Sequence, residues 1–487
     1  MSWELEIGSW ELSGLSCRLS SRTMNRPVLR LLFAVGVVTS LHAQTAGGHI
    51  NTPFADAKPI FDAVRPEVLP AELRGKPAAQ LEAAWPAWVA RRDAEIRARV
   101  EQGDEDSLVN LLLFGATFTT QPRPSTRVLA ALAVDPDAAL RALSPRIDDF
   151  VAAMASPGAN ERMQFARQVL THKGIDPVTV EGKSAARRFL EERTRVVGAG
   201  SVVQSSRLLD PDAELRDTLT VFRDRGLSSD TSIFIDHGID QALTDIKAKG
   251  LFAAGSVRRV AIVGPGLDFT DKLEGYDFYP PQTIQPFALV DSLVRLGLAA
   301  PAAIHVTSFD LSARVIRHID SARERAGSGQ SYVLVLPRNT DRPWTADLVK
   351  YWQRIGDRVG VESRTATPPA GVGRVQVRSV RVRPSVVLST SARDLNIVLQ
   401  RPDPLSAGDR FDLILATNIL LYYDVFEQSL AATNIAEMLR PGGLFLSNNR
   451  IFELPTFPFS SVGFTDVTYM SLKGIGETGD RIVWYRR

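Results

Sequence analysis

The segment 411–449 constrains the fold of this chain more than any other stretch: FDLILATNILLYYDVFEQSLAATNIAEMLRPGGLFLSNN. Its first six residues form a short apolar run, which is typical of a buried strand. A helix follows, because Ala431, Ile435 and Leu439 recur at helical spacing, and the letters RPGG then end it. LFLS is a second apolar run. A strand, a helix and a strand in this order predict a parallel βαβ unit, whose ligand-binding groups lie at the carboxyl ends of the strands.

The same alternation extends over residues 251–487. Apolar runs at 257–264 and 303–309 predict two more buried strands, and a helical pattern follows each of them. The chain ends in two runs, 462–470 and 480–487, whose glycine-rich connection predicts a hairpin. We therefore expect an α/β domain at 251–487, built on a single doubly wound, Rossmann-like sheet with a C-terminal antiparallel hairpin.

Two further β-rich runs lie inside this domain. We expect YVLVLP (332–337) in the same sheet and RVQVRSVRVRPSVV (374–387) as extended chain. A slip in the alternation near Ser379 indicates a bulge in the second run. Its arginines are interpreted as a solvated strand face: Arg374, Arg378, Arg381 and Arg383.

The pattern over 81–250 is helical and predicts an all-α domain ahead of the sheet. DPDAALRAL and DPDAELRDTL look like two copies of one helix start, in which Asp135 and Asp210 cap the helix and a proline takes its first position. We interpret this acidic pair as structural and not as metal ligands. Asp230 is expected to cap the last helix, 231–249.

The N-terminal 80 residues divide into three parts. Met24 begins a segment with two arginines, an apolar run over 31–41 and a possible cleavage site after Ala43, which resembles a secretory signal peptide. Residues 1–23 are then an upstream over-read, and 44–80 a linker rich in Pro, Ala and Gly. The apolar run is too short to span a membrane, so no stable span is expected in the mature chain. Export to the periplasm or medium follows; a buried N-terminal helix in a cytoplasmic protein is the alternative.

Composition excludes several classes of function. A chain of 487 residues has room for two or three domains, and its net charge of +2 predicts no nucleic-acid partner. The sole cysteine, Cys17, allows neither a disulfide framework nor a cysteine metal site. The six histidines are scattered, so no metal site is expected.

Two strand ends carry groups suited to a nucleotide. Gly264 and Gly266 follow the first strand, where glycine lets the backbone approach a ligand closely. Asp310 follows the second strand, where a carboxylate accepts hydrogen bonds from both hydroxyls of a ribose. The alternative is that Asp310 caps the helix beginning near Ser312. Phe269 stands where a dinucleotide fingerprint has its third glycine, which counts against NAD.

The combined motifs GPG, FDLS, DLNIV, FDLILATNILLYYD and LRPGG resemble those of class I S-adenosylmethionine-dependent methyltransferases. Residues 255–450 are most similar to the catalytic domain of the chemotaxis-receptor glutamate methyltransferases, a resemblance that covers less than half of the chain. It implies S-adenosylmethionine as cofactor and methyl transfer to an oxygen or nitrogen nucleophile. The acceptor would be a small molecule or a protein side chain.

The resemblance also assigns roles to individual residues. Asn396 and Ile397 match the family's pair at the adenine, Thr417 and Asn418 match its arginine–asparagine pair, and Tyr422 its substrate-side tyrosine. The expected cofactor-binding residues are Gly264, Gly266, Gln285, Asp310, Asn396, Ile397, Thr417, Asn418 and Arg123. Tyr422 is the candidate catalytic residue.

Some positions depart from the family. Gln285 replaces an acid and Thr417 replaces an arginine, while the loop 267–282 is an insertion. Its acids offer replacements for the missing charge: Asp268, Asp271 and Glu274. Arg123 lies in FGATFTTQPR, an echo of a cofactor-facing segment, although the helical region as a whole does not resemble the family's N-terminal domain.

Simpler interpretations stand beside these. Asn418 fits a turn residue at a strand end, and Tyr422 fits a core aromatic with a satisfied hydroxyl. Asp394 fits a turn. At the level of function, the alternatives are an exported, non-catalytic binding protein that retains the methyltransferase fold and, more weakly, an NAD-linked oxidoreductase.

Overall fold

The computed structural model describes residues 48–209, 222, 225–267, 274–454, 457–472 and 476–487. The expected over-read and signal peptide, with Cys17, lie outside the described residues, as do Asp210, Asp268 and Asp271. No helix in the described part of the chain is long and apolar enough to cross a membrane.

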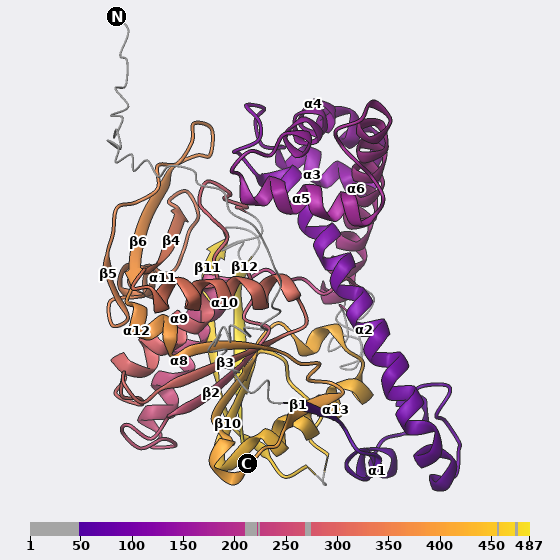
Figure 1. Cartoon of the computed structure of the whole chain (residues 1–487), viewed down its shortest axis with the longest axis vertical. Coiled ribbons are helices and arrows are strands. Elements are labelled where there is room, and N and C mark those ends of the chain that lie inside the picture. The colour runs from indigo at the N-terminus through magenta and orange to yellow at the C-terminus, as the bar shows by residue number, and fades with distance from the viewer. Residues whose placement is uncertain (1–47, 210–221, 223–224, 268–273, 455–456, 473–475) are drawn as a thin grey trace, which may run out of the picture. The chain divides into compact units, whose positions relative to one another are not determined.

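A seven-stranded, mostly parallel sheet forms the centre of the fold, in the order β11-β12-β10-β9-β2-β3-β7 (Figure 1). Its parallel strands are β2 (Arg259–Val263), β3 (His305–Asp310), β7 (Thr390–Asp394), β9 (Phe411–Ala416) and β10 (Leu439–Ser447). Numbered along the chain, these five strands follow the order 3-2-1-4-5 of doubly wound nucleotide-binding sheets. The expectation of an α/β fold with a mostly parallel central sheet is therefore confirmed.

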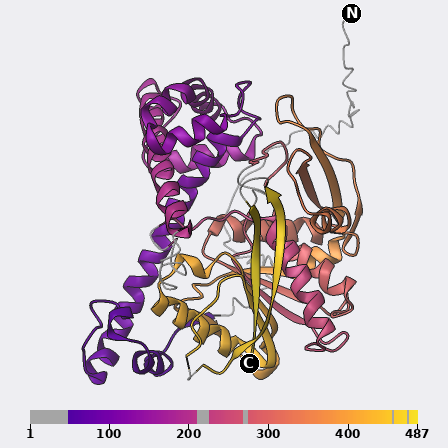
Figure 2. The same ribbon diagram turned by 180° about the vertical axis from the view of Figure 1, so that it is seen from behind.

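Two long antiparallel strands complete this sheet. β11 (Ser460–Leu472) pairs with β12 (Gly476–Arg486), and β12 pairs with β10 (Figure 2, yellow). β12, the last strand along the chain, thus lies between β11 and β10 in the sheet. This arrangement brings the far end of the hairpin next to the carboxyl ends of β9 and β10.

Helices cover both faces of the sheet because its strands are buried on both sides. Val260 and Ile262 of β2 pack with α8 (Ile233–Ala248) and α9 (Gln285–Arg295). Ala261 and Val263 point to the opposite face, which α13 (Val425–Met438) covers. α10 (Ala313–Gly327) follows β3.

The helix α8 was assigned to the all-α region by its position in the sequence, but its isoleucines and leucines pack on the sheet. It begins at Ile233, and Ser232, not Asp230, caps it by accepting a hydrogen bond from the backbone of Phe234. The predicted cap is therefore wrong. Asp230 instead reaches a pocket described below.

A separate three-stranded antiparallel sheet is inserted between α10 and β7, in the order β4-β6-β5. Its elements are β4 (Tyr332–Asn339), α11 (Ala346–Arg354), β5 (Gly360–Glu362) and β6 (Val375–Val382), followed by α12 (Pro384–Leu388). The prediction of a single sheet over 251–487 is wrong, because YVLVLP pairs with β6. The short polar strand β7 takes the place beside β3.

The bulge expected near Ser379 is also not observed, since the pairing of β4 with β6 runs without a shift through Val335 and Ser379. Ser379 and Val380 are both buried, so both faces of β6 are covered there and the alternation breaks. Arg378 is not on a solvated face either. Its side chain is 14% exposed and donates to the backbone oxygens of Trp352 and Ile355.

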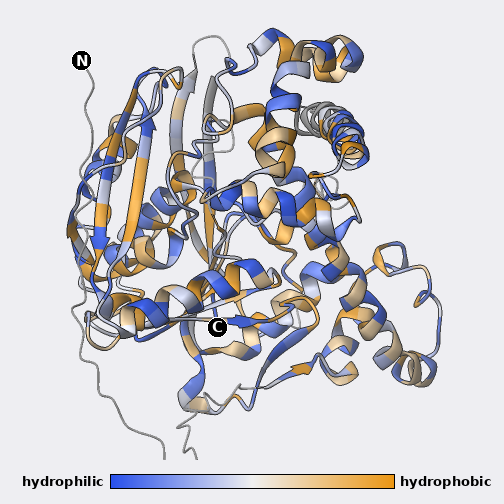
Figure 3. Cartoon of the chain, turned by 45° about the horizontal axis from the view of Figure 1, so that its top comes forward, coloured by the Kyte–Doolittle hydropathy of each residue, from blue (hydrophilic) through white to orange (hydrophobic). Residues whose placement is uncertain are grey.

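The helical region contains α2 (Ala78–Phe114), α3 (Thr126–Val134), α4 (Pro136–Ala155), α5 (Glu161–His172) and α6 (Val180–Leu209). Hydrophilic and hydrophobic residues alternate along its helices (Figure 3), and the apolar faces share one core. Asp135 caps α4 with Pro136 in its first turn, as expected.

The helix α2 belongs to two cores at once. It has 37 residues and is about 55 Å long at 1.5 Å per residue. Its second half packs in the helical core, whereas Trp85 and Trp88 in its first half surround Phe426 of α13. Arg92 also pairs with Glu427 of α13 at 2.5 Å. The chain therefore does not change from one packing unit to another at residue 81.

Residues 48–80, which fall in the expected linker or wrapping segment, contain regular secondary structure. β1 (Gly48–Asn51) pairs antiparallel with β8 (Gln400–Asp403), and α1 (Phe54–Ala63) and the 3₁₀ turn η1 (Pro66–Val68) follow. The rings of Phe54 and Phe61 each lie about 6 Å from the ring of Trp85, which anchors this Pro-rich segment on the core.

Candidate functional site

A pocket of about 610 Å³ opens at the carboxyl ends of β2, β3 and β9. The strand order reverses between β2 and β9, and this switch point is where doubly wound sheets bind ligands. The volume lies in the range of small-molecule sites. The strand-end residues that line the pocket are Val263, Gly264, Gly266, Phe309, Asp310, Thr417 and Asn418.

The glycine turn after β2 is sterically closed to other residues. Gly264 and Gly266 have φ angles of 67° and 72°, in the left-handed region that favours glycine. A Cβ at Gly264 would lie 2.2 Å from Cδ1 of Ile419, and one at Gly266 would lie 2.9 Å from the backbone oxygen of Asp230. Both glycines therefore pack closely against Ile419 and Asp230, which also line the pocket.

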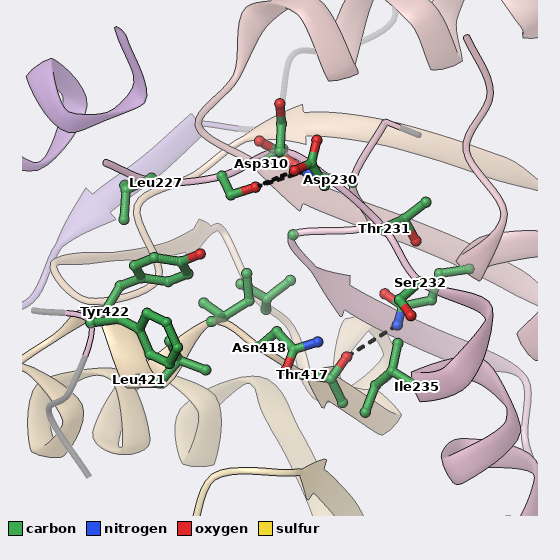
Figure 4. Close-up of a pocket in the computed structure, with 18 of the residues that line it drawn as sticks. Leu227, Asp230, Thr231, Ser232, Ile235, Asp310, Thr417, Asn418, Leu421 and Tyr422 are labelled. Atoms are coloured by element: carbon green, nitrogen blue, oxygen red, sulfur yellow. Dashed lines mark hydrogen bonds between the residues drawn. The ribbon is translucent and has the colours of Figure 1, made fainter. Parts of the chain in front are cut away.

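Asp310 lines the pocket at the end of β3 (Figure 4). One carboxylate oxygen accepts a hydrogen bond from the backbone N–H of Ser312 at 2.7 Å, at the start of α10. Asp310 therefore does not cap α10, whose N-cap residue is Ser312 and which has no side-chain capping hydrogen bond, and its carboxylate stays in the pocket. Burial raises the pKa of Asp310 to about 7, although the backbone hydrogen bonds oppose this shift.

Asn418 is both a turn residue and a pocket residue. Its φ of 58° is left-handed, which asparagine tolerates better than most residues. Its backbone N–H donates to Oδ1 of Asn448 at 2.8 Å, and its own Oδ1 accepts from Nδ2 of Asn448 at 2.7 Å. Asn448 follows β10, so this pair connects the ends of two neighbouring strands.

Gln285 and Thr417, the two positions that depart from the resembled family, are in contact. Nε2 of Gln285 donates to Oγ1 of Thr417 at 3.1 Å, and both residues are buried and line the pocket. One departure removes a negative charge and the other removes a positive charge. These two neutral side chains are therefore joined by a hydrogen bond at the pocket wall.

The tyrosines of LLYYD lie beside the pocket with different exposures. Tyr422, at the end of the 3₁₀ turn η3 (Leu420–Tyr422), turns its ring toward the pocket in Figure 4. Its carbonyl accepts a hydrogen bond from Arg99 of α2 at 2.9 Å. Tyr423 is buried, which raises the pKa of its hydroxyl, so the core-aromatic interpretation suits Tyr423 better than Tyr422.

The loop after β7 contributes apolar side chains and not the expected amide. Leu395 and Ile397 line the pocket. Asn396 is fully buried, donates to Asp93 of α2 at 2.8 Å and accepts from the backbone N–H of Val398. Asn396 is therefore not among the lining residues, and this geometry does not support its assignment to the adenine.

Arg123 does not line the pocket either. Its guanidinium lies 3.7 Å from Glu274 and 4.9 Å from the ring centroid of Tyr276, in a loop contact between the helical region and the insertion. Glu274 also binds Arg342 at 2.8 Å and does not reach the pocket as a replacement charge. Arg123, which the segment FGATFTTQPR suggested as a cofactor ligand, therefore makes a packing contact outside the pocket.

Two groups of lining residues were missed by sequence reasoning. The first is the segment 227–232 ahead of α8, in which Ser228 hydrogen-bonds to Asp230 at 2.9 Å. The second comes from the hairpin and includes Tyr469 and Asp480. Neither follows a parallel strand, so the rule that located the other residues could not find them. Within the described residues, no cluster of three His, Cys, Asp or Glu side chains suits a metal ion.

Comparison with known proteins assigns no family. No protein-family model matches the sequence, and no curated protein matches it. The similar solved structures include the glycopeptide N-methyltransferase MtfA complexed with sinefungin, at 11% identity over 50% of this chain and 66% of that chain, with a TM-score of 0.20.

Two other solved structures are similar over a larger part of their own length. Magnesium protoporphyrin IX methyltransferase (ChlM) from Synechocystis PCC 6803, with bound SAM, shares 10% identity over 59% of this chain and 96% of that chain, with a TM-score of 0.24. MtNAS in complex with MTA and tNA shares 10% identity over 74% and 96%, with a TM-score of 0.22. The likeness is distant in all three cases, so the functional argument below depends on the pocket.

Proposed function

We propose that this chain is an S-adenosylmethionine-dependent methyltransferase that acts on an oxygen or nitrogen of a small molecule or a protein side chain. The observation that carries the proposal is the shape of the switch-point pocket. The turn after β2 has two glycines with left-handed backbone angles, Gly264 and Gly266, and the carboxylate of Asp310 lies at the end of β3. This combination suits a nucleoside cofactor, because glycine lets the backbone approach the ligand closely and a carboxylate accepts hydrogen bonds from ribose hydroxyls.

The residues fit such a cofactor at both of its ends. Asp310 would accept hydrogen bonds from the ribose hydroxyls, while Leu395 and Ile397 would flank the adenine with apolar side chains. Gly264 and Gly266 would let the backbone approach the amino-acid portion. When bound, S-adenosylmethionine supplies a methyl group on a positively charged sulfur.

The protein's contribution to the reaction would be mainly positioning. In-line transfer requires the nucleophile and the methyl group at a short, aligned distance, and holding two reactants in this way removes much of the barrier. Tyr422 would form part of the acceptor wall, and the segment 227–232 would cover the pocket and exclude water. Glutamate-ester formation, which the chemotaxis-receptor enzymes suggest, does not follow from the fold.

A second candidate is an exported, non-catalytic binding protein with the same fold. The signal-like segment 24–43 supports export, and the neutral Gln285–Thr417 pair is compatible with a site that has lost its original charges. Under the main proposal the chain can equally act in the cytoplasm, where the methyl donor is made. Cofactor binding separates the two candidates.

The test is calorimetric titration of the full chain with S-adenosylhomocysteine and, separately, with NAD. Binding of S-adenosylhomocysteine without binding of NAD is the expected result. Binding of neither ligand would favour the non-catalytic candidate. Binding of NAD alone would replace the methyltransferase proposal with an oxidoreductase.

A further inference from the structure

The pocket extends beyond the residues proposed for the cofactor. Its lining also includes the hairpin residues Tyr469, Met470, Thr478 and Asp480, and Leu421 and Tyr422. Leu421 and Tyr422 lie on the side of the pocket opposite Ser232 and Ile235 in Figure 4. If the cofactor occupies the strand-end half, the remaining half is where a methyl acceptor would lie.

One carboxylate is held in this remaining half by two donors. Oδ2 of Asp480 accepts a hydrogen bond from the hydroxyl of Tyr469 at 2.9 Å, and Oδ1 accepts from Nδ2 of Asn448 at 3.2 Å. Asn448 is itself fixed by its paired hydrogen bonds with Asn418. The network fixes the orientation of a carboxylate at the pocket wall, and the three residues Asn418, Tyr469 and Asp480 all line the pocket.

The surroundings of this carboxylate are apolar and aromatic. The ring of Tyr469, whose hydroxyl binds this carboxylate, lies 5.5 Å from the ring of Phe234, Met470 follows in the lining, and burial raises the pKa of Asp480 above its ordinary value. Among the described lining residues the basic side chain is Arg225, whose guanidinium lies 3.9 Å from Asp106 of α2. Asp480 is therefore a partly buried carboxylate whose orientation is fixed at the pocket wall, which suits a proton acceptor.

We propose that Asp480 accepts the proton of the methyl acceptor, and that the acceptor is an uncharged, largely apolar molecule with a hydroxyl or amine group. This inference rests on the proposed methyltransferase function. The acceptor's O–H or N–H proton passes to the Asp480 carboxylate. A lone pair on the acceptor's oxygen or nitrogen forms the bond to the methyl carbon as the carbon–sulfur bond breaks. The electron pair of the broken bond stays on sulfur.

The same carboxylate argues against a carboxylate acceptor such as a glutamate side chain. An ionised carboxylate is already a nucleophile and has no proton to lose. It would also lie against Asp480 in a poorly solvated pocket, where like charges repel strongly. Asp480 on the hairpin thus disfavours the glutamate acceptor that the sequence resemblance implies.

The test compares two probes of equal ring size, 2-naphthol and 2-naphthoate, titrated into the full chain saturated with S-adenosylhomocysteine. We expect wild type to bind 2-naphthol and to bind 2-naphthoate roughly tenfold or more weakly, because the anion meets Asp480. Asp480→Asn should bring the two affinities close together. Asp466→Asn, an exposed acid of the same hairpin that pairs with Arg481, is the matched control and should retain the wild-type difference.

The outcomes are distinguishable from failure of the proposed function. If S-adenosylhomocysteine itself does not bind, the methyltransferase proposal fails. If S-adenosylhomocysteine binds but wild type binds neither naphthalene probe, or binds both with equal affinity, the inference about the acceptor is overturned. This outcome is measured on wild type alone. Normal S-adenosylhomocysteine affinity in Asp480→Asn shows that the variant is folded, so an unchanged probe difference in that variant also overturns the inference.

Discussion

The two ends of the pocket are built in different ways. At the cofactor end, Gly264 and Gly266 lie in the turn after β2, and Asp310 is the last residue of β3. At the acceptor end, Tyr469 and Asp480 come from the two strands of one hairpin, and side-chain hydrogen bonds join them to each other and, through Asn448, to the strand-end residue Asn418. A strand end can be recognised from local pattern, whereas a network across a hairpin depends on pairing that the pattern does not specify.

This difference predicts different sensitivities to mutation. The cofactor end should fail when an added atom obstructs the backbone wall, and the acceptor end should change its selectivity when a single side-chain atom is exchanged. The following predictions test the contrast in order of expected effect.

The largest effect is expected from Gly264→Ala. The new Cβ would meet Ile419 at 2.2 Å and would also force alanine into a left-handed conformation, at a cost of about 1–2 kcal/mol. We expect S-adenosylhomocysteine affinity to fall roughly a hundredfold, which corresponds to about 2.8 kcal/mol. Calorimetric titration measures the loss.

Gly250→Ala is the matched control for this substitution. Gly250 has the same φ of 67°, but a Cβ there would meet nothing within 4 Å. Gly250→Ala should lose only the stability that the left-handed conformation costs, about 1–2 kcal/mol, and keep wild-type affinity for S-adenosylhomocysteine. Equal affinity in both variants would show that the glycine turn does not form the ligand wall.

Asp310→Ala should have the next largest effect. The variant removes a charged acceptor, and hydrogen bonds to charged groups contribute about 1.5–3 kcal/mol. S-adenosylhomocysteine affinity should fall roughly ten- to a hundredfold, and the thermal stabilisation by the ligand should fall with it. Asp409→Ala, at an exposed acid paired with Arg259, is the control and should bind as wild type does.

Asp310 also predicts a pH dependence with opposite signs for stability and binding. Its pKa is about 7 in the folded chain against about 3.9 in an unfolded one, so the folded state retains the proton between these values. The contribution of Asp310 to stability is therefore present below about pH 4 and is lost as the pH rises through 7. Ligand affinity should rise over the upper part of the same range, because the ionised carboxylate is the better acceptor.

Two measurements check these signs. Urea unfolding of wild type and Asp310→Asn at pH 5 and pH 8 should show that the variant gains stability relative to wild type at the higher pH. Titration with S-adenosylhomocysteine should show tighter binding to wild type at pH 8 and no such change in Asp310→Asn. A pH-independent difference between the two proteins would contradict the assigned pKa.

The smallest effect on cofactor binding is expected from Tyr422→Phe. The ring remains, and only a hydroxyl on the acceptor side is removed, so S-adenosylhomocysteine affinity should stay within about twofold of wild type, a few tenths of a kcal/mol. Turnover should fall once an acceptor is identified. A large loss of cofactor affinity would place Tyr422 at the other end of the pocket.

The predictable part of the fold follows the same contrast. The unit β9–α13–β10 was readable because two apolar runs flank a helical pattern, although the predicted stop is wrong, since α13 ends at Met438 and RPGG lies within β10. The assignment of β4 to the main sheet was wrong, because a β-branched run indicates a strand but not its partner. β7 was missed since it is short and polar, although it lies beside β3 in the sheet.

The candidate site was predicted in part for related reasons. Asp310 and the glycine turn were found because position after a strand decides where they lie. Asn396 and Arg123 were carried over from a resemblance, and the structure places both in packing contacts outside the pocket. Asp480 carries no motif, and its position depends on the register between β11 and β12, which a single sequence does not fix.

The most direct test of the central claim, that the two ends of one pocket have separate tasks, is S-adenosylhomocysteine affinity in wild type, Asp310→Ala and Asp480→Asn under identical conditions. The account predicts binding to wild type, a roughly ten- to hundredfold loss in Asp310→Ala and affinity within about twofold of wild type in Asp480→Asn. Equal losses of S-adenosylhomocysteine affinity in the two variants, or no loss in either, would contradict the division of the pocket into a cofactor end and an acceptor end. Absence of binding to wild type would contradict the assignment of the pocket to this cofactor.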